Sequence, residues 1–360
     1  MGKIGSWISY QWLDIKISGN KNPPSFIWLL RPLPPLDCTC GLDVVVSTKP
    51  FRFEEMWFFD PSCSRVVEVV WSSNDMVDPS TKVMRKVEKC GKELKMWNRD
   101  HFGNVRKELA KKRRFLVDGE KEAMRSGSNH RVREVKREII ELIDKDNRMW
   151  FQWAKVLWAK DGDKNSKFFH SRATQRKRKN SIQKIWAASG DWTSNPEEVE
   201  KCPIDYFQEL FTSANLQHNV AATDSINKVT SSEMNAELSI EFKACEVQQT
   251  IKQMAPLKAP GPDGMSHLFY QHYWNLVGDD VCQSVLNFLN NASLPEHLNH
   301  TFITLIPKKK NPEYAFKFRP ISLCYVLYKI FSKVLANRLK RISPKIITEH
   351  QSAFTKNRFL

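Results

Sequence analysis

The sequence contains no apolar run that could cross a membrane. A transmembrane helix needs about 20 consecutive, mostly apolar residues, and the chain of 360 residues has no such stretch. Its start also lacks the continuous apolar core of a secretory signal. The opening string MGKIGS fits a myristoylation pattern, but no basic cluster follows it closely enough to supply a second anchor. We therefore expect no secretory segment, no transmembrane segment and no membrane partner.

Paired cysteines are missing as well. The eight cysteines are scattered, and no two of them form a C-x-x-C pair. Cys38 and Cys40 stand alone, and His297 and His300 have no cysteines nearby, so a zinc site is not expected. In a chain this long, scattered cysteines favour reduced thiols in an intracellular protein. The predicted location is the nucleus or the cytoplasm, and we predict no metal site within the chain.

Acidic residues are scarce in two parts of the chain, whose overall net charge is +16. Residues 79–184 hold 31 Lys or Arg against 14 Asp or Glu, and residues 301–360 hold 13 against 2. Their net charges of +17 and +11 bracket an acidic segment with a net charge of −10. A basic excess concentrated in this way is typical of proteins that bind nucleic acid. RNA or single-stranded DNA is therefore the predicted partner; the sequence predicts no oligomeric state.

Apolar residues repeat every seven positions in the first basic segment. Two series show the repeat: Val83, Cys90 and Trp97, and Val135, Leu142, Met149 and Val156. The string RSGSNH at 125–130 separates them with turn residues. This pattern predicts two long helices in an antiparallel hairpin, with an intermolecular coiled coil as the alternative. Asp146 falls where the repeat predicts an apolar residue, which weakens the seam there or fixes its register.

A dense group of cations follows the predicted hairpin. Its members are Arg172, Arg176, Lys177, Arg178 and Lys179. Phe168, Phe169 and Trp186 flank it in the sequence, and aromatic rings can stack on bases. Two interpretations remain open at this point. The cations form either a solvated surface, as most charge runs do, or a patch that contacts phosphates or directs nuclear import.

Turn and cap signals mark residues 181–240. The string SIQKIWAASGDWTSN (181–195) alternates around a Ser-Gly-Asp turn and predicts a β-hairpin. Asn195, Pro196 and the acidic residues after them predict the start of a helix. Residues 213–240 are polar and weakly patterned, which indicates a surface connection.

A rigid loop, KAPGPDG, separates two amphipathic helical patterns after residue 241. Pro260 restricts φ, whereas Gly261 and Gly264 permit close backbone approach. Asp263 is placed to cap the following helix. The loop can be a tight capped turn, a contact surface, or both.

Two short strands and a basic amphipathic helix complete the pattern. The strands are predicted at Phe302–Ile306 and Arg319–Leu323, and without further strands they would leave unpaired edges. The strings KAPGPDG, LIPKKKNPEYAFKFRPISL, YKIFSKVLANRLK and HQSAFTKNR occur in this order. Together they resemble the fingers and early palm of reverse transcriptases from plant non-LTR (LINE-type) retrotransposons. WAKDGDKNSKFFHSRATQRKRKNSI is similar to the linker of those elements, and PFRFEEMWFFDPSCSRVVEVVW to the last strand and tail of their endonuclease domain.

The resemblance implies roles for individual residues. Arg319 matches the arginine near the incoming nucleotide, and Arg358 the basic residue after the Q-S-A-F block. The loop residues Pro260, Gly261, Asp263 and Gly264 would lie against the template. Gln351, Ser352 and Phe354 would line the template–nucleotide region. Lys308, Lys309 and Lys310 fall at the finger tip, where general solvation is the favoured interpretation.

The resemblance also shows what these 360 residues do not contain. The family holds Mg²⁺ with palm carboxylates that lie beyond the Q-S-A-F block, and no Tyr-Ala-Asp-Asp string occurs. The chain supplies no catalytic or metal-binding residue of that kind, so we expect a reading frame truncated before the palm motifs and inactive as a polymerase. A co-opted nucleic-acid-binding module and an inert pseudogene product are the alternatives.

The expected fold is mixed α/β and predominantly α, with a long helical hairpin followed by a partial reverse-transcriptase domain. The expected organisation is 1–49 unassigned, with an unrelated start as one explanation; 50–78 endonuclease remnant; 79–184 basic helical linker; 185–240 hairpin, helix and polar connection; and 241–360 partial reverse-transcriptase domain on the fingers side.

Overall fold

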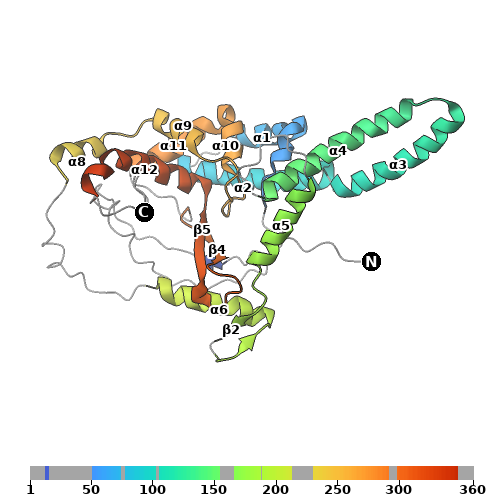
Figure 1. Cartoon of the computed structure of the whole chain (residues 1–360). Helices are drawn as coiled ribbons and strands as arrows, with labels where there is room; N and C mark the ends of the chain where they lie inside the picture. The colour runs from blue at the N-terminus through green and yellow to red at the C-terminus, as the bar shows by residue number, and fades with distance from the viewer. Residues whose placement is uncertain are drawn as a thin grey trace. The chain divides into compact units, whose positions relative to one another are not determined.

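The structure is a computed structural model that describes residues 13–15, 51–73, 78–102, 105–154, 166–187, 189–212, 230–291 and 298–347. The chain divides into two compact units. The first holds the described residues of 51–73 and 86–181, and the second holds those of 13–15, 78–85 and 182–347. Helices predominate over two small sheets, which confirms the predicted mixed but mainly helical class (Figure 1).

The first unit begins with an aromatic segment that packs on helices. After an extended stretch come the 3₁₀-helix η2 (Glu55–Phe59) and α1 (Pro61–Trp71), and Asp60 caps α1 through Ser62 N at 3.0 Å. Trp57 meets Trp97 of α2 (Pro79–Trp97) edge to face at 5.8 Å. The resemblance to an endonuclease strand therefore falls on residues that form no strand over 51–54 and are mainly helical from 55 onward.

The sequence predicted one long helix before the turn at 125–130. That prediction is wrong in one respect, because the structure has two helices there. A π-helical turn, η3 (Asn98–Phe102), ends α2, and α3 (Val105–Ser126) follows. The predicted turn is confirmed: Gly127 has a φ of 71°, and α4 (His130–Ala154) returns antiparallel to α3. Ion pairs Lys112–Glu138 at 2.6 Å and Lys136–Glu120 at 3.2 Å join the two helices.

A further helix, α5 (Ser166–Asn180), carries the dense group of cations and packs on α4. The sequence did not predict this helix. Residues 155–165, which join α4 to α5, lie outside the described residues. Within the part of the chain that the structure describes, no helix is long and apolar enough to span a bilayer.

The second unit begins with the predicted hairpin of β2 (Ile185–Trp186) and β3 (Trp192–Thr193), turned by Gly190 at φ 86°. The Asn195 side chain caps α6 (Pro196–Phe211) by accepting from Glu197 N at 3.2 Å, as predicted. The hairpin and α6 share a core with the strand pair β4 (Thr301–Pro307) and β5 (Phe318–Cys324). That core contains Ile185, Val199, Ile204, Phe207, Ile303, Leu305 and Phe318.

The predicted strands β4 and β5 form an antiparallel pair, with Ile306 opposite Arg319 and Ile303 opposite Ser322. The expectation of two unpaired edges is wrong, because β1 (Leu13–Ile15) pairs with β4 on its other side. The sheet order is thus β1-β4-β5, and part of the exposed edge of β4 is covered.

Helices α8 (Ser232–Ser239), α9 (Ala244–Gln253), α10 (His267–His272), α11 (Trp274–Asn291) and α12 (Val326–Ile346) complete the second unit. The predicted connection 213–240 contains α8, and residues 213–229 lie outside the described ranges. The single helix expected after the loop is split at Tyr273. Helices α9, α11 and α12 pack on one another and bury their apolar faces.

Candidate nucleic-acid interface

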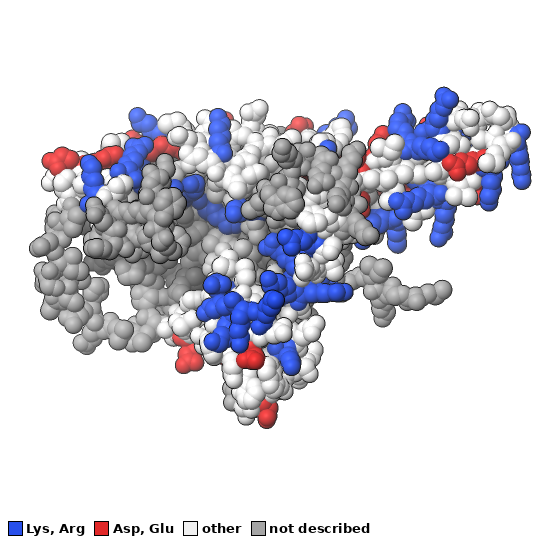
Figure 2. Space-filling view, in the orientation of Figure 1, with Lys and Arg blue, Asp and Glu red and all other residues white. Residues whose placement is uncertain are grey.

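The cations of α5 lie mainly on its exposed side. Phe169 and Ala173 are buried and Lys177 is half-buried, so the spacing of four residues defines the face that packs inward. The remaining cations are exposed: Arg172, Arg176, Arg178 and Lys179. Lysine and arginine side chains cover much of this side of α5 and both edges of the hairpin (Figure 2).

The aromatic residues near this helix are less available than the sequence suggested. Phe169 is 1% exposed and meets Phe151 edge to face at 5.4 Å, so it cannot stack on a base. Phe168 is half-buried, with the guanidinium of Arg172 5.8 Å from its ring centroid. The surface at α5 itself therefore offers charge rather than open aromatic rings.

A polar junction fixes α5 to the hairpin, and Asp146 is at its centre. The Asp146 carboxylate accepts from Arg106 Nε and from Trp150 Nε1, each at 3.2 Å. His170 of α5 stacks on Trp150 at 3.7 Å, and its Nε2 lies 3.7 Å from Asp146 Oδ2. Burial and the nearby Arg106 lower the pKa of His170. The acidic residue in the apolar repeat thus positions the helix that carries the cations.

The proline–glycine loop is shaped by contact with the chain's own backbone. A Cβ on Gly261 would lie 2.2 Å from the carbonyl oxygen of Cys324 at the end of β5, so only glycine fits there. Gly264 has a φ of 66°, which also favours glycine. Pro260 is half-buried beside this contact. These observations give the loop a packing role; its predicted contact with a template stays a prediction.

Asp263 caps a helix, but not the one expected. Its Oδ2 accepts from Val326 N at 2.8 Å, so it caps α12, 63 residues away, rather than the following helix α10. Its Oδ1 is buried with no hydrogen-bond partner among the described residues. Burial of the carboxylate raises its pKa from 3.8 to about 6, against the opposing effect of the Val326 N–H and of Lys329. Part of the residue stays accessible, but the carboxylate itself does not.

Arg319 projects from the exposed face of the strand pair. It alternates with Ile321 along β5, and it lies opposite Ile306 of β4; all three are exposed. The other face of the pair is covered by α6 and the β2–β3 hairpin through Leu305 and Phe318. Among the described residues, none forms an ion pair with Arg319, and its predicted contact with a nucleotide stays a prediction. The other predicted nucleotide-binding residue, Arg358, lies outside the described residues, as do Gln351, Ser352 and Phe354.

The finger-tip lysines behave differently from one another. Lys308 donates to Phe316 O at 2.8 Å, and Lys309 pairs with Glu313 at 3.4 Å, whereas Lys310 is exposed. The turn between β4 and β5 therefore uses two of its lysines internally.

The described residues do not provide the carboxylate cluster that Mg²⁺ requires in this class of polymerase. Among them, no group of three or more His, Cys, Asp or Glu side chains is placed to hold a metal ion. Asp280 is paired with Lys82 at 3.0 Å, and Asp263 caps α12.

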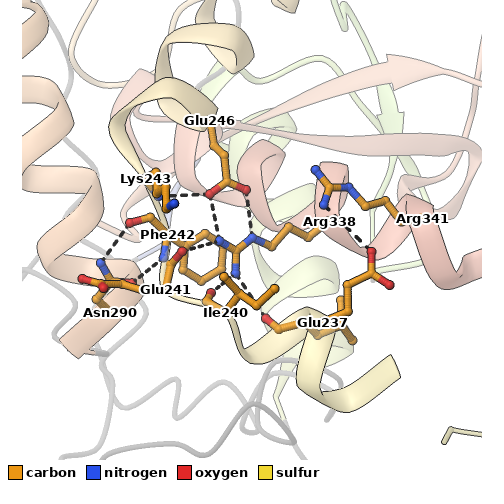
Figure 3. Close-up of polar contacts among 10 residues, drawn as sticks. Glu237, Ile240, Glu241, Phe242, Lys243, Glu246, Asn290, Arg338 and Arg341 are labelled. Atoms are coloured by element: carbon orange, nitrogen blue, oxygen red, sulfur yellow. Dashed lines mark hydrogen bonds and ion pairs between the residues drawn. The ribbon is translucent and has the colours of Figure 1, made fainter. Parts of the chain in front are cut away.

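Sequence reasoning missed Arg338, a buried cation that joins three helices. It is 5% exposed and binds Glu246 of α9 through two hydrogen bonds, Nε to Oε1 at 2.9 Å and a terminal nitrogen to Oε2 at 2.8 Å. It also donates to the carbonyls of Leu238, Ile240 and Glu241. Figure 3 shows its guanidinium at the centre of these groups, over the Phe242 ring at 3.4 Å.

The pattern of α12 holds a signal for this role. Ile330, Val334 and Ile342 are buried at intervals of four and eight residues, and Arg338 falls on the same face. A cation on an apolar stripe indicates a buried partner, and the carboxylate of Glu246 is that partner.

No protein-family model matches the chain. The chain is similar to the "Transposon TX1 uncharacterized 149 kDa protein" of Xenopus laevis, with 26% identity over 194 residues. The matched region makes up 53% of this chain and 15% of the relative, so the chain spans a small part of the relative's length. This similarity supports a non-LTR retrotransposon origin, which the ordered motifs also indicate. It does not bear on the resemblance to plant elements, because the relative comes from another kind of organism.

Proposed function

We propose that the chain is a segment from the reverse-transcriptase region of a non-LTR retrotransposon protein and that it binds RNA or single-stranded DNA. The order of the motifs and the similarity to a transposon protein support the first part. The succession of strand, basic turn, strand and amphipathic helix over 301–346 is compatible with the fingers side of such an enzyme.

The observation that carries the binding proposal is the exposed side of α5. Arg176, Arg178 and Lys179 have no acidic partner among the described residues, although the surrounding segment pairs many of its other charges. Cations at the last turn of a helix are also favoured by the helix dipole, but that effect is small and needs no cluster of this size. Neutralisation of nucleic-acid phosphates releases counterions, which gives such a cluster a strong ligand.

The salt dependence of binding tests this proposal. Fluorescence anisotropy with a labelled single-stranded oligonucleotide would give the affinity of the full chain at several salt concentrations. Each phosphate contact contributes roughly 0.7 to the slope of log K against log [salt]. Replacement of four α5 cations with alanine should therefore make the slope less steep, reducing its magnitude by up to about 3. The four are Arg172, Arg176, Arg178 and Lys179.

A control variant removes the same charge from another helix of the basic segment. It replaces four cations of α2 with alanine: Arg85, Lys89, Lys92 and Lys95. If net charge alone governs binding, both variants lower the slope equally. If α5 is the contact surface, the α2 variant keeps the wild-type slope. An unchanged slope in the α5 variant would show that its cations are only a solvated face.

A separate proposal is that this 360-residue chain does not polymerise DNA by itself. The supporting observation is that its sequence holds no Tyr-Ala-Asp-Asp string, so the carboxylates that clamp the two metal ions are not supplied. Purified chain with primed poly(rA), dTTP and Mg²⁺ or Mn²⁺ should incorporate no more nucleotide than a blank without protein. Incorporation above the blank would refute it.

A further inference from the structure

Four aromatic rings form a continuous row in the second unit. Trp192 meets Trp186 at 5.5 Å, Trp186 meets Tyr314 at 6.0 Å, and Tyr314 stacks on Phe316 at 5.3 Å. The first two rings belong to the β2–β3 hairpin, and the other two to the turn between β4 and β5. The row thus connects segments that are more than a hundred residues apart.

Successive side chains along a strand point to opposite faces, which explains why the hairpin rings lie outside the core. Ile185 points into the core that it shares with Ile303 and Phe318, so the next side chain, Trp186, points away from it. Trp192 lies directly opposite Trp186 in the register of the two strands. A hydrogen bond from Trp186 N to Glu313 O at 2.7 Å fixes the hairpin to the turn, immediately before Tyr314.

Both ends of the row are accessible and each carries a lysine. Trp192 is 44% exposed and Phe316 is 43% exposed, whereas the two inner rings are half-buried. The ammonium of Lys184 lies 4.6 Å from the Trp192 ring, and that of Lys317 lies 4.7 Å from the Phe316 ring. Exposed rings of this size are costly to leave in water unless a partner covers them.

We propose that the row Trp192–Trp186–Tyr314–Phe316 is a stacking platform for the bases of single-stranded nucleic acid. Every base has a flat aromatic face, so rings in a row can stack on successive bases with little dependence on sequence. A lysine above an exposed ring is weakly held there, so a base can displace it and the ammonium can move to the adjoining phosphate. Lys308 on the same turn adds a further cation at the Phe316 end, where its Nζ donates to Phe316 O at 2.8 Å.

The charge near the row favours nucleic acid over an apolar protein partner. Glu313 is next to Tyr314, but Lys309 pairs with it at 3.4 Å. Two acidic residues are exposed near Trp192: Asp191 in the hairpin turn, and Glu198, which accepts a hydrogen bond from Thr193 Oγ1. Lysines over both terminal rings suit a ligand that combines flat apolar faces with negative charge. A proline-rich peptide could use the rings but not the cations.

The salt dependence of the affinity distinguishes this stacking site from the α5 surface. Phosphate contacts set the slope of affinity against salt, whereas stacking sets a contribution that salt does not change. The stacking proposal therefore does not rest on the α5 proposal, and either can fail while the other stands.

The test uses the full chain and a short labelled oligothymidylate at a salt concentration that weakens phosphate contacts. The double variant Trp192→Ala, Phe316→Ala should bind at least about tenfold more weakly than the wild type, because two stacking rings are lost. The slope of log K against log [salt] should not change. The variant Trp192→Phe, Phe316→Tyr keeps both rings and should bind within about threefold of the wild type, which a loss of stacking would not allow.

An oligomer of abasic sites and a matched aromatic substitution supply the controls. The abasic oligomer should bind the wild type and the double alanine variant equally. Phe115→Ala removes a ring of similar exposure, 45%, with Lys111 over it at 5.7 Å, and should leave binding unchanged.

Equal affinity of the wild type and the double alanine variant for oligothymidylate overturns the proposal, and so does an equal loss on the abasic oligomer. If the double alanine variant does not fold, the wild type decides alone: equal affinity for the two oligomers at that salt concentration overturns the platform.

Discussion

The α3–α4 hairpin and the group of helices α9, α11 and α12 bury their apolar residues to different extents. In the hairpin, Leu116, Val135 and Ile139 lie on the seam but are only half-buried. In the other group, Val277 and Ile330 are completely buried. Two helices leave both sides of their seam open to water, whereas a third helix closes one side. Stability in the hairpin must therefore come largely from local contacts, and in the second unit from contacts between distant parts of the sequence.

One ion pair from each region shows the same difference in burial. Arg338 and Glu246 are separated by 92 residues, and their side chains are 6% and 22% exposed. Lys112 and Glu138 of the hairpin are 24% and 37% exposed. An ion pair removed from water is costly to break because the remaining charge stays buried, whereas an exposed pair has little effect. The comparison can be tested by variants of each region.

The largest effect is expected for Arg338→Ala. The substitution removes the cation paired with the Glu246 carboxylate, which keeps only Lys243 N as a donor, and it leaves three carbonyls without the Arg338 donor, so the free energy of unfolding should fall by about 3–5 kcal/mol. The control is Arg341→Ala on the same helix, whose side chain is 63% exposed and 3.9 Å from Glu237. That change should cost no more than about 0.5 kcal/mol. Urea unfolding of both variants measures the difference, and equal losses would contradict a structural role for Arg338.

The next largest loss of stability is expected for Gly261→Ala, which is compared with Gly127→Ala in the hairpin turn. Gly261→Ala puts a Cβ against the backbone of Cys324, which cannot move as a side chain end can, and we expect a loss of roughly 2–3 kcal/mol. Gly127→Ala in the hairpin turn meets no atom within 4 Å, and only its φ of 71° opposes alanine. Its cost should be about 1 kcal/mol. Thermal unfolding of the two variants should rank them in this order; the reverse order would show that the loop does not pack as described.

A pH effect of up to about 3 kcal/mol is expected from Asp263. Its pKa in the folded chain is raised from 3.8 to about 6, so the folded state binds the proton more tightly than the unfolded state does. Its contribution to stability is complete below the unfolded pKa and is lost as the pH rises through about 6. Asp263→Asn cannot ionise but keeps an oxygen for Val326 N, so it should become more stable than the wild type as the pH rises.

The measurement is the difference in unfolding free energy between the wild type and Asp263→Asn across this pH range. A difference that does not change with pH would mean that the carboxylate is not buried in the folded chain.

Local signals in the sequence predicted much of the fold. The turn at Gly127, the cap at Asn195 and the strands β4 and β5 each depend on residues that are neighbours in the chain. The break between α2 and α3 was missed although Gly103, which directly follows η3 in the sequence, is a signal for it. The pairing of β1 with β4 was missed because it joins residues about 290 positions apart and only three residues take part.

The candidate sites were predictable to a smaller extent. The cations of α5 are a contiguous string, and their exposure follows from the helical period once α5 is known. The aromatic row could not be read from the sequence, because Trp186 and Tyr314 meet only through the shared core of α6 and the strand pair. The cap from Asp263 to α12 is non-local in the same way.

The smallest change in stability is expected for the hairpin pair Lys112–Glu138, which is the exposed counterpart of the Arg338–Glu246 pair. The two side chains are 2.6 Å apart but partly exposed, so water screens their attraction. A double-mutant cycle with Lys112→Ala and Glu138→Ala should give a coupling energy of at most about 1 kcal/mol. About 1 M salt should remove most of it, because the screening length is then only about 3 Å. The same cycle for Arg338 and Glu246 should give a larger coupling that salt changes less, since the Arg338 side chain is only 6% exposed. Equal couplings with equal salt dependence would mean that the two regions are held by the same kind of contact, which would contradict the difference in burial.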